Sequence, residues 1–137
     1  MYRKILVPVD LAHLDGLERS IDTATDLAKH YGASLHFVGI TTTTPSEVAH
    51  TPEEYSRKLH EYAERQGAAH GLSASSIART SHDPAVDLSH QLLEAIGDAG
   101  ADLVVMASHV PGLADHVFAS HGGAVAAHAR VSVLLVR

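Results

Sequence analysis

Strand-like and helix-like segments alternate along the whole of this chain. Between successive apolar runs, apolar residues recur at helical spacing, as Leu17, Ile21 and Ala24 do. The apolar runs are short and rich in β-branched residues, as buried strands are, and they cover residues 3–9, 34–40, 75–81, 101–107 and 131–136. Strands that alternate with helices in this way form a parallel sheet covered on both faces. The sequence therefore predicts a doubly wound, Rossmann-like α/β fold.

Helix boundaries are indicated by capping residues and glycines. Polar caps and Pro mark helix starts, and Gly marks helix ends. The predicted helices run from an Asp15 cap to Gly32, from a Thr51 cap to about Gly71, from Asp83-Pro84 to about Gly97–Gly100, and onward from Ser120 or nearby. No linker, repeat or low-complexity segment separates these elements. We therefore expect one domain over residues 1–137.

Charge and composition exclude several classes of protein. The net charge is −6 with no basic cluster, which disfavours nucleic-acid binding. No apolar run approaches the ~18 residues of a membrane span, and Pro8 and Asp10 end the first apolar run too early for a signal peptide. The chain has no Cys, so it has neither disulfides nor thiolate ligands. We expect a cytoplasmic protein with no membrane insertion.

Twelve His residues are the unusual feature of the composition. They are spread along the chain, and most lack the spacing of metal ligands. We predict no native metal site and interpret the His residues as a surface that buffers protons weakly near neutral pH.

The stretch from Asp102 to Arg137 is the best candidate for a ligand site. It combines a buried strand, a polar loop, a helix start and a final strand, which we also expect to be buried. Ligands of open α/β sheets bind at the carboxyl ends of the strands. A small, polar loop that leads into a helix offers free N–H groups and a positive dipole end to an anion.

Several segments together resemble the universal stress protein family. They are Ile5–Asp10, Asp83-Pro84, residues 101–109 and residues 128–137, in that order. The resemblance covers nearly the whole chain. It implies a five-stranded parallel sheet of order 3-2-1-4-5 with four helices. It also implies a homodimer, with Val131–Val136 as the pairing strand.

The glycine motif of ATP-binding family members is altered here. That motif is Gly, two residues, Gly, nine residues, then Gly-Ser or Gly-Thr. Its glycines correspond to Ala107, Val110 and Ala119, its hydroxyl residue corresponds to Ser120, and the loop is one residue shorter. A short-loop branch with Ala-Ser-His-Arg-Pro is similar and includes nucleotide binders. Val110 replaces the Arg of that branch, so a cation that faces phosphate is missing.

The resemblance implies contacts for an adenine nucleotide. Asp10 accepts hydrogen bonds from the base or, equally, orients its own loop, and Mg²⁺ bridges the phosphates. His109 or His121 adds a donor, Ser120 adds its hydroxyl or only caps the helix, and Gly122 allows close packing. Adenine is expected against Pro8, Val9, Val38 and Met106, the ribose near Ser108, His109 and Val110, and the phosphates at the N–H groups of Ser120, His121 and Gly122.

Two functions remain open. The first is a regulator that holds ATP, or AMP or ADP, and acts through an unknown protein partner. The second is a nucleotide-free dimeric scaffold, which the missing glycines favour. We do not expect dedicated catalysis, because the loop has no Lys or Arg to stabilise a transferring phosphate and no activated nucleophile. Slow intrinsic ATP hydrolysis is compatible with this view.

Overall fold

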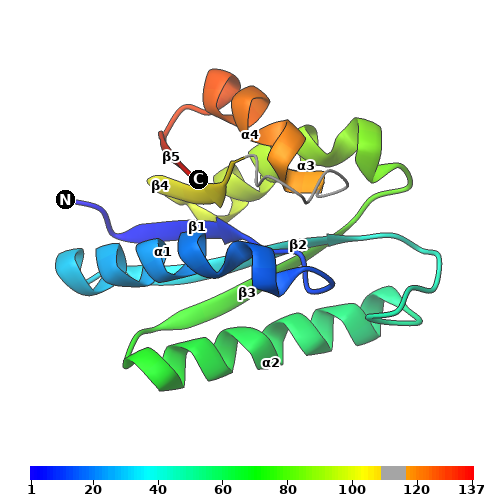
Figure 1. Ribbon diagram of the computed structural model, residues 1–137, viewed down its shortest axis with the longest axis horizontal. Coiled ribbons are helices and arrows are strands. Elements are labelled where there is room, and N and C mark those ends of the chain that lie inside the picture. The colour runs from blue at the N-terminus through cyan, green and yellow to red at the C-terminus, as the bar shows by residue number, and fades with distance from the viewer. Residues whose placement is uncertain (109–116) are drawn as a thin grey trace.

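The computed structural model (Figure 1) describes residues 1–108 and 117–137, and of residues 117–120 only the backbone. The strands are β1 (Lys4–Pro8), β2 (Ser34–Thr41), β3 (Ala74–Thr80), β4 (Leu103–Ala107) and β5 (Ser132–Val136). The helices are α1 (Glu18–Tyr31), α2 (Pro52–His70), α3 (Pro84–Ala99) and α4 (Val117–His128), and a 3₁₀ turn, Leu14–Leu17, precedes α1.

All five strands are parallel, in the order β3-β2-β1-β4-β5. This confirms the predicted sheet. In Figure 1, α3 and α4 lie on one side of the sheet and α1 and α2 on the other, and each pair buries its own apolar cluster against the strands. Side chains alternate between the two faces, as the pleat requires. Ile5 and Val7 face α1 and α2, whereas Leu6 faces α3 and α4.

The last strand differs from the prediction. It was expected to be buried, but β5 is an edge strand paired only with β4, and Leu134 and Leu135 remain 38% and 36% exposed. A strand at the end of a sheet has one ladder of unpaired backbone groups, whatever its composition. The apolar composition of this strand led to the expectation of burial, although the strand order 3-2-1-4-5 implied by the family resemblance already places it at the edge.

Of the three predicted caps, Thr51 and Asp83 occupy the expected positions and Asp15 does not. Thr51 is confirmed, because its Oγ1 accepts from the Glu54 N–H at 3.1 Å. Asp15 instead lies inside the 3₁₀ turn, and α1 begins at Glu18 without a side-chain cap. Asp83 occupies the N-cap position of α3 but makes no side-chain cap bond. There the buried Ser81 hydroxyl accepts from the Asp83 N–H at 3.2 Å and so shapes the entry to the helix.

Asp102 fastens the amino end of β1 to the segment before β4. Its carboxylate accepts from the N–H groups of Arg3, at 2.9 Å, and Lys4, at 3.0 Å. Partial burial raises the pKa of Asp102, but the N–H groups of Lys4, Arg3 and Asp102 itself, together with the Arg3 charge, hold the pKa below its usual value. The Asp102 backbone N–H also donates to the Lys4 carbonyl at 3.0 Å, and β4 begins at Leu103 and not at Ala101 as predicted.

Candidate functional site

The carboxyl ends of β1 and β4 lie next to each other at the centre of the sheet. β1 pairs with both β2 and β4, so the order in which strands are added reverses there: β2 and β3 follow on one side, β4 and β5 on the other. This is the topological switch point at which open α/β sheets bind ligands. Asp10 follows β1 and Ser108 follows β4 at this edge.

Asp10 is bound to its own loop. Its Oδ1 accepts from the Ala12 N–H at 3.0 Å, and its Oδ2 lies 2.9 Å from Nδ1 of His13. Its backbone carbonyl accepts from the His13 N–H at 3.0 Å. The structure therefore supports the loop-orienting role. The carboxylate is still 22% exposed, so it retains acceptor capacity for a ligand.

The apolar residues predicted to contact adenine do not all share one face. Val38 and Met106 belong to the cluster under α3 and α4, whereas Val9 points to the α1 and α2 side. Pro8 follows Leu6 by two residues and shares its face. All four side chains are buried. A base can contact them directly only if a covering neighbour moves.

Ser108 carries a buried hydroxyl. Its backbone N–H donates to the Val136 carbonyl at 2.7 Å, which ties it to the end of β5. Its Oγ is shielded from solvent and has no hydrogen-bond partner among the described residues. Buried hydroxyls are normally hydrogen-bonded, so this atom calls for a polar partner beyond those that the described residues supply.

The last helix begins earlier than predicted. It includes Val117, three residues before Ser120, so Ser120 lies inside α4. Free N–H groups belong to the first turn of a helix, and Ser120 lies at least three residues into this one. Contact of phosphates with Ser120, His121 and Gly122 stays a prediction. The side chains of Ala119 and Ser120 are not described, and His109 and Val110 lie outside the described residues.

His121 and Gly122 have structural contacts of their own. Nδ1 of His121 lies 2.6 Å from the Ser89 hydroxyl of α3, so this ring joins α3 to α4. A Cβ at Gly122 would lie 3.0 Å from Cδ2 of Leu135 and 3.9 Å from the Ala107 carbonyl. Gly122 thus lets α4 approach β4 and β5, which is the packing role considered for it from the sequence.

Two residues near this edge were missed by the sequence analysis. Tyr55 of α2 is buried over Gly39 of β2, where a Cβ would lie 2.4 Å from its hydroxyl. Burial, and then the Asp10 carboxylate, raise the pKa of Tyr55. Arg137 follows Val136, the residue that binds Ser108, and so brings a cation to this edge. The sequence signal that could have revealed Tyr55 is Gly39, because a glycine inside a strand often marks a close approach of another group to the backbone.

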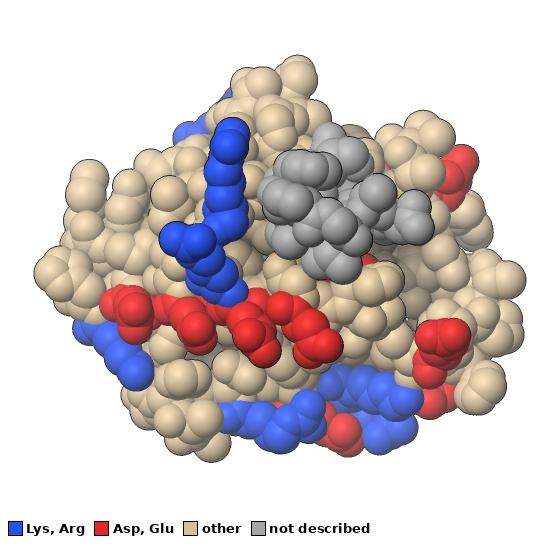
Figure 2. Space-filling model, viewed as in Figure 1, with Lys and Arg blue, Asp and Glu red and all other residues tan. Residues whose placement is uncertain are grey.

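A hollow of about 370 Å³ lies away from the switch point, between α1 and α2. Figure 2 shows acidic side chains in a row across this face of the molecule. The hollow is lined by Leu14, Asp15, Glu18, Ile21, Asp22, Tyr62, Gln66 and His70. Its acidic wall repels a phosphate, so it does not compete with the switch point as a nucleotide site.

Metal and membrane features can be stated for the described part of the chain. Among these residues, no three His, Asp or Glu side chains are grouped in a way that could hold a metal ion. Within the same residues, no helix has both the length and the apolar character that crossing a bilayer requires.

Comparisons with known proteins match the whole chain. The family model described as Universal stress protein family matches residues 1–137. A curated relative, Universal stress protein G of Shigella flexneri, is 25% identical over 145 residues, with 100% of each chain covered.

Two solved structures share this fold. A universal stress family protein from Burkholderia pseudomallei has a TM-score of 0.72 at 22% identity, covering 98% of this chain and 96% of its own. A universal stress protein from Archaeoglobus fulgidus in complex with dAMP has a TM-score of 0.68 at 17% identity, covering 99% and 98%. At these identities the likeness establishes a common backbone arrangement.

Proposed function

Because the chain belongs to the universal stress protein family, we propose that it binds an adenine nucleotide, ATP in the first place, at the carboxyl ends of β1 and β4. It acts through a partner protein and not through turnover. The observation that carries the proposal is the buried hydroxyl of Ser108, which has no hydrogen-bond partner among residues 1–108 and 121–137. A ribose hydroxyl or a bound water of the nucleotide complex would satisfy it.

Three further features support a nucleotide at this edge. The edge is the switch point of the sheet, and the Asp10 carboxylate keeps part of its surface open to a ligand. A helix N-terminus offers free N–H groups to phosphates, and α4 follows β4 in the chain. The dAMP complex of the A. fulgidus protein, which shares the fold, supports adenine nucleotides as the ligand class.

Mg²⁺ would be held by the phosphates of ATP. Mg²⁺ commonly takes one or two carboxylates plus phosphate oxygens, but both Asp10 oxygens already accept hydrogen bonds within their loop. The protein therefore contributes little direct coordination. Turnover is not proposed, because residues 107–121 contain no Lys or Arg that could stabilise a transferring phosphate.

The alternative is a nucleotide-free dimeric scaffold. The complete burial of Val9, Val38 and Met106 favours it, because a packed core leaves no slot for a base. A dimer fits either function. The open edge of β5, with Leu134 and Leu135 partly exposed, offers a ladder that a second copy could complete.

The first experiment identifies what the purified protein carries. Compounds released by acid would be identified by mass and absorbance, and Mg-ATP binding would be titrated calorimetrically. ATP or AMP near one per chain supports the nucleotide function. No released nucleotide, together with no binding at millimolar Mg-ATP, supports the scaffold.

A matched pair of variants then tests Ser108. Ser108→Ala should weaken nucleotide binding by about 1–2 kcal/mol without loss of stability, since its Oγ has no described partner to lose. Thr25→Val is the control, because Thr25 Oγ1 is also buried and unpaired but belongs to α1. Equal affinity of both variants and the parent protein would remove the Ser108 hydroxyl from the site.

A further inference from the structure

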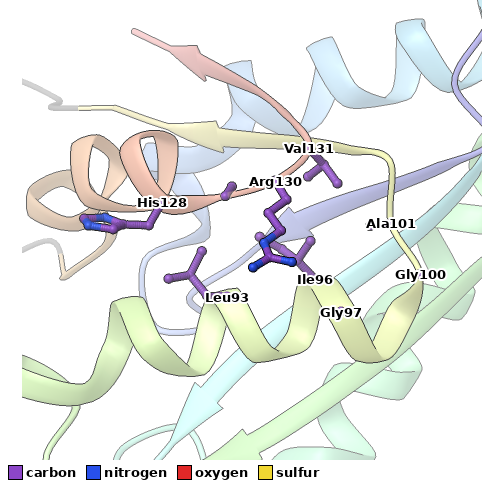
Figure 3. Close-up of a pocket in the computed structure, with 9 residues that line it drawn as sticks. Leu93, Ile96, Gly97, Gly100, Ala101, His128, Arg130 and Val131 are labelled. Carbon is purple, nitrogen blue, oxygen red and sulfur yellow. The ribbon is translucent and has the colours of Figure 1, made fainter.

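A cavity of about 390 Å³ opens at the amino-terminal edge of the sheet (Figure 3). It lies between the last turns of α3 and α4 and the residues that lead into β4 and β5. Parallel strands place all their amino ends on one edge. The five-residue β4, which spans ~16 Å, therefore separates this cavity from the proposed nucleotide site.

The wall of the cavity is apolar. Leu93 and Ile96 of α3 form one side, and Val131, the residue before β5, forms the other (Figure 3). Leu93 and Val131 are only partly buried, so apolar surface remains uncovered inside the cavity. Gly97 deepens the hollow, because a Cβ there would meet no atom within 4 Å.

Arg130 provides a cation over this apolar wall. Its side chain extends toward α3 in Figure 3, where its guanidinium lies near Ile96 and Gly97. Within the described residues Arg130 makes no ion pair and no side-chain hydrogen bond. The acids of α3 do not neutralise it, since Glu94 and Asp98 both pair with Arg79.

His128 lies at the rim of the same cavity. Its Nδ1–H donates to the Ala124 carbonyl of its own helix at 2.9 Å, so in the neutral ring the other nitrogen is an acceptor and adds no donor to the cavity. The chain carries a net charge of −6, yet among the described residues that line this cavity the one charged residue is the cation Arg130. Charge complementarity therefore selects a negatively charged head group.

We propose that this cavity binds a small molecule that joins one anionic group to a compact apolar body, with a medium-chain carboxylate as its representative. The apolar body packs against Leu93, Ile96 and Val131, and the carboxylate pairs with Arg130. The volume lies at the small end of the range of ligand pockets, about 300–1,000 Å³. Neither the family match nor the nucleotide site assigns a ligand to this edge.

The probe is octanoate, titrated into the full chain by calorimetry and by NMR. Octylammonium has the same chain length with the opposite charge. We expect octanoate to bind and octylammonium to bind at least several-fold more weakly. No octanoate binding at millimolar concentration, or equal binding of the two probes, would overturn the proposal.

Three variants locate the binding. Gly97→Leu places a side chain in the empty space and favours the helix over Gly, so we expect a folded protein that no longer binds octanoate. Arg130→Met keeps the apolar stem and should weaken binding about two- to five-fold, since the guanidinium is open to water. Gly123→Leu, at another helical glycine with open space, is the control and should bind like the parent protein. Unchanged octanoate binding by Gly97→Leu would show that the ligand sits elsewhere.

Discussion

Gly39→Ala tests the close approach of α2 to β2 beside the candidate site. The new Cβ would lie 2.4 Å from Oη of Tyr55, 2.9 Å from its Cε1 and 3.0 Å from its Cζ. Tyr55 is 5% exposed, so its ring cannot swing into solvent. Overpacking of this kind lowers the free energy of unfolding by about 1–3 kcal/mol. Replacing Gly by Ala also reduces the flexibility of the unfolded chain, which raises the free energy of unfolding by about 0.4–1 kcal/mol. The clash dominates, and we expect a net loss of about 1–2 kcal/mol.

Urea denaturation with linear extrapolation measures this loss. Tyr55→Phe removes the atom in closest contact, so Gly39→Ala should be less destabilising in the Tyr55→Phe background, with a coupling energy of at least about 0.5 kcal/mol. Gly123→Ala, which meets no neighbour, is the control and should stabilise α4 by about 0.5–1 kcal/mol. Wild-type stability of Gly39→Ala, or the same loss in both backgrounds, would refute the reasoning.

Three other outcomes are expected. Burial, and after it the charge of Lys4, lower the pKa of His36 in the folded protein. The imidazole therefore binds a proton more tightly in the unfolded chain. Stability should fall as pH drops below about 6.5, and urea midpoints should show a smaller fall for His36→Gln. Val133→Pro should block pairing of β5 and yield monomers by light scattering; a folded dimer would place the interface elsewhere. Arg137→Gln should weaken Mg-ATP binding two- to five-fold and reduce its salt dependence, as about 1 kcal/mol of exposed charge pairing predicts; unchanged affinity would exclude a phosphate contact.

Most of the fold could be predicted because it depends on local periodicity. Apolar runs and helical stripes fixed the element order, and Gly32, Gly71 and Gly100 end their helices with φ of 67°, 66° and 64°. Capping was less predictable, because it depends on contacts outside the helix. Thr51 bonds within its own first turn, whereas the entry to α3 is shaped by Ser81, which lies before the local pattern begins.

The site was predictable in location but not in the directions of its side chains. The switch point follows from strand order, and Asp10 lies there as expected. Whether Val9 shares a face with Val38 depends on the register of two strands, which one sequence does not reveal. The Ser108 hydroxyl, for which the described residues offer no hydrogen-bond partner, is shielded from solvent by tertiary packing, so no spacing rule could indicate it.

The contact of Asp102 with the first strand also has a consequence for synthesis. Its bond to the Lys4 N–H joins residues 98 positions apart, and β1 meets β4 over a comparable distance. At typical translation speeds the ribosome needs roughly 5–20 s to extend the chain that far. During that interval β1, β2 and β3 can pair, but the inner edge of β1 stays open. We therefore expect the nascent chain to depend on chaperones until its second half emerges, and the slow step of refolding to be closure of this central seam.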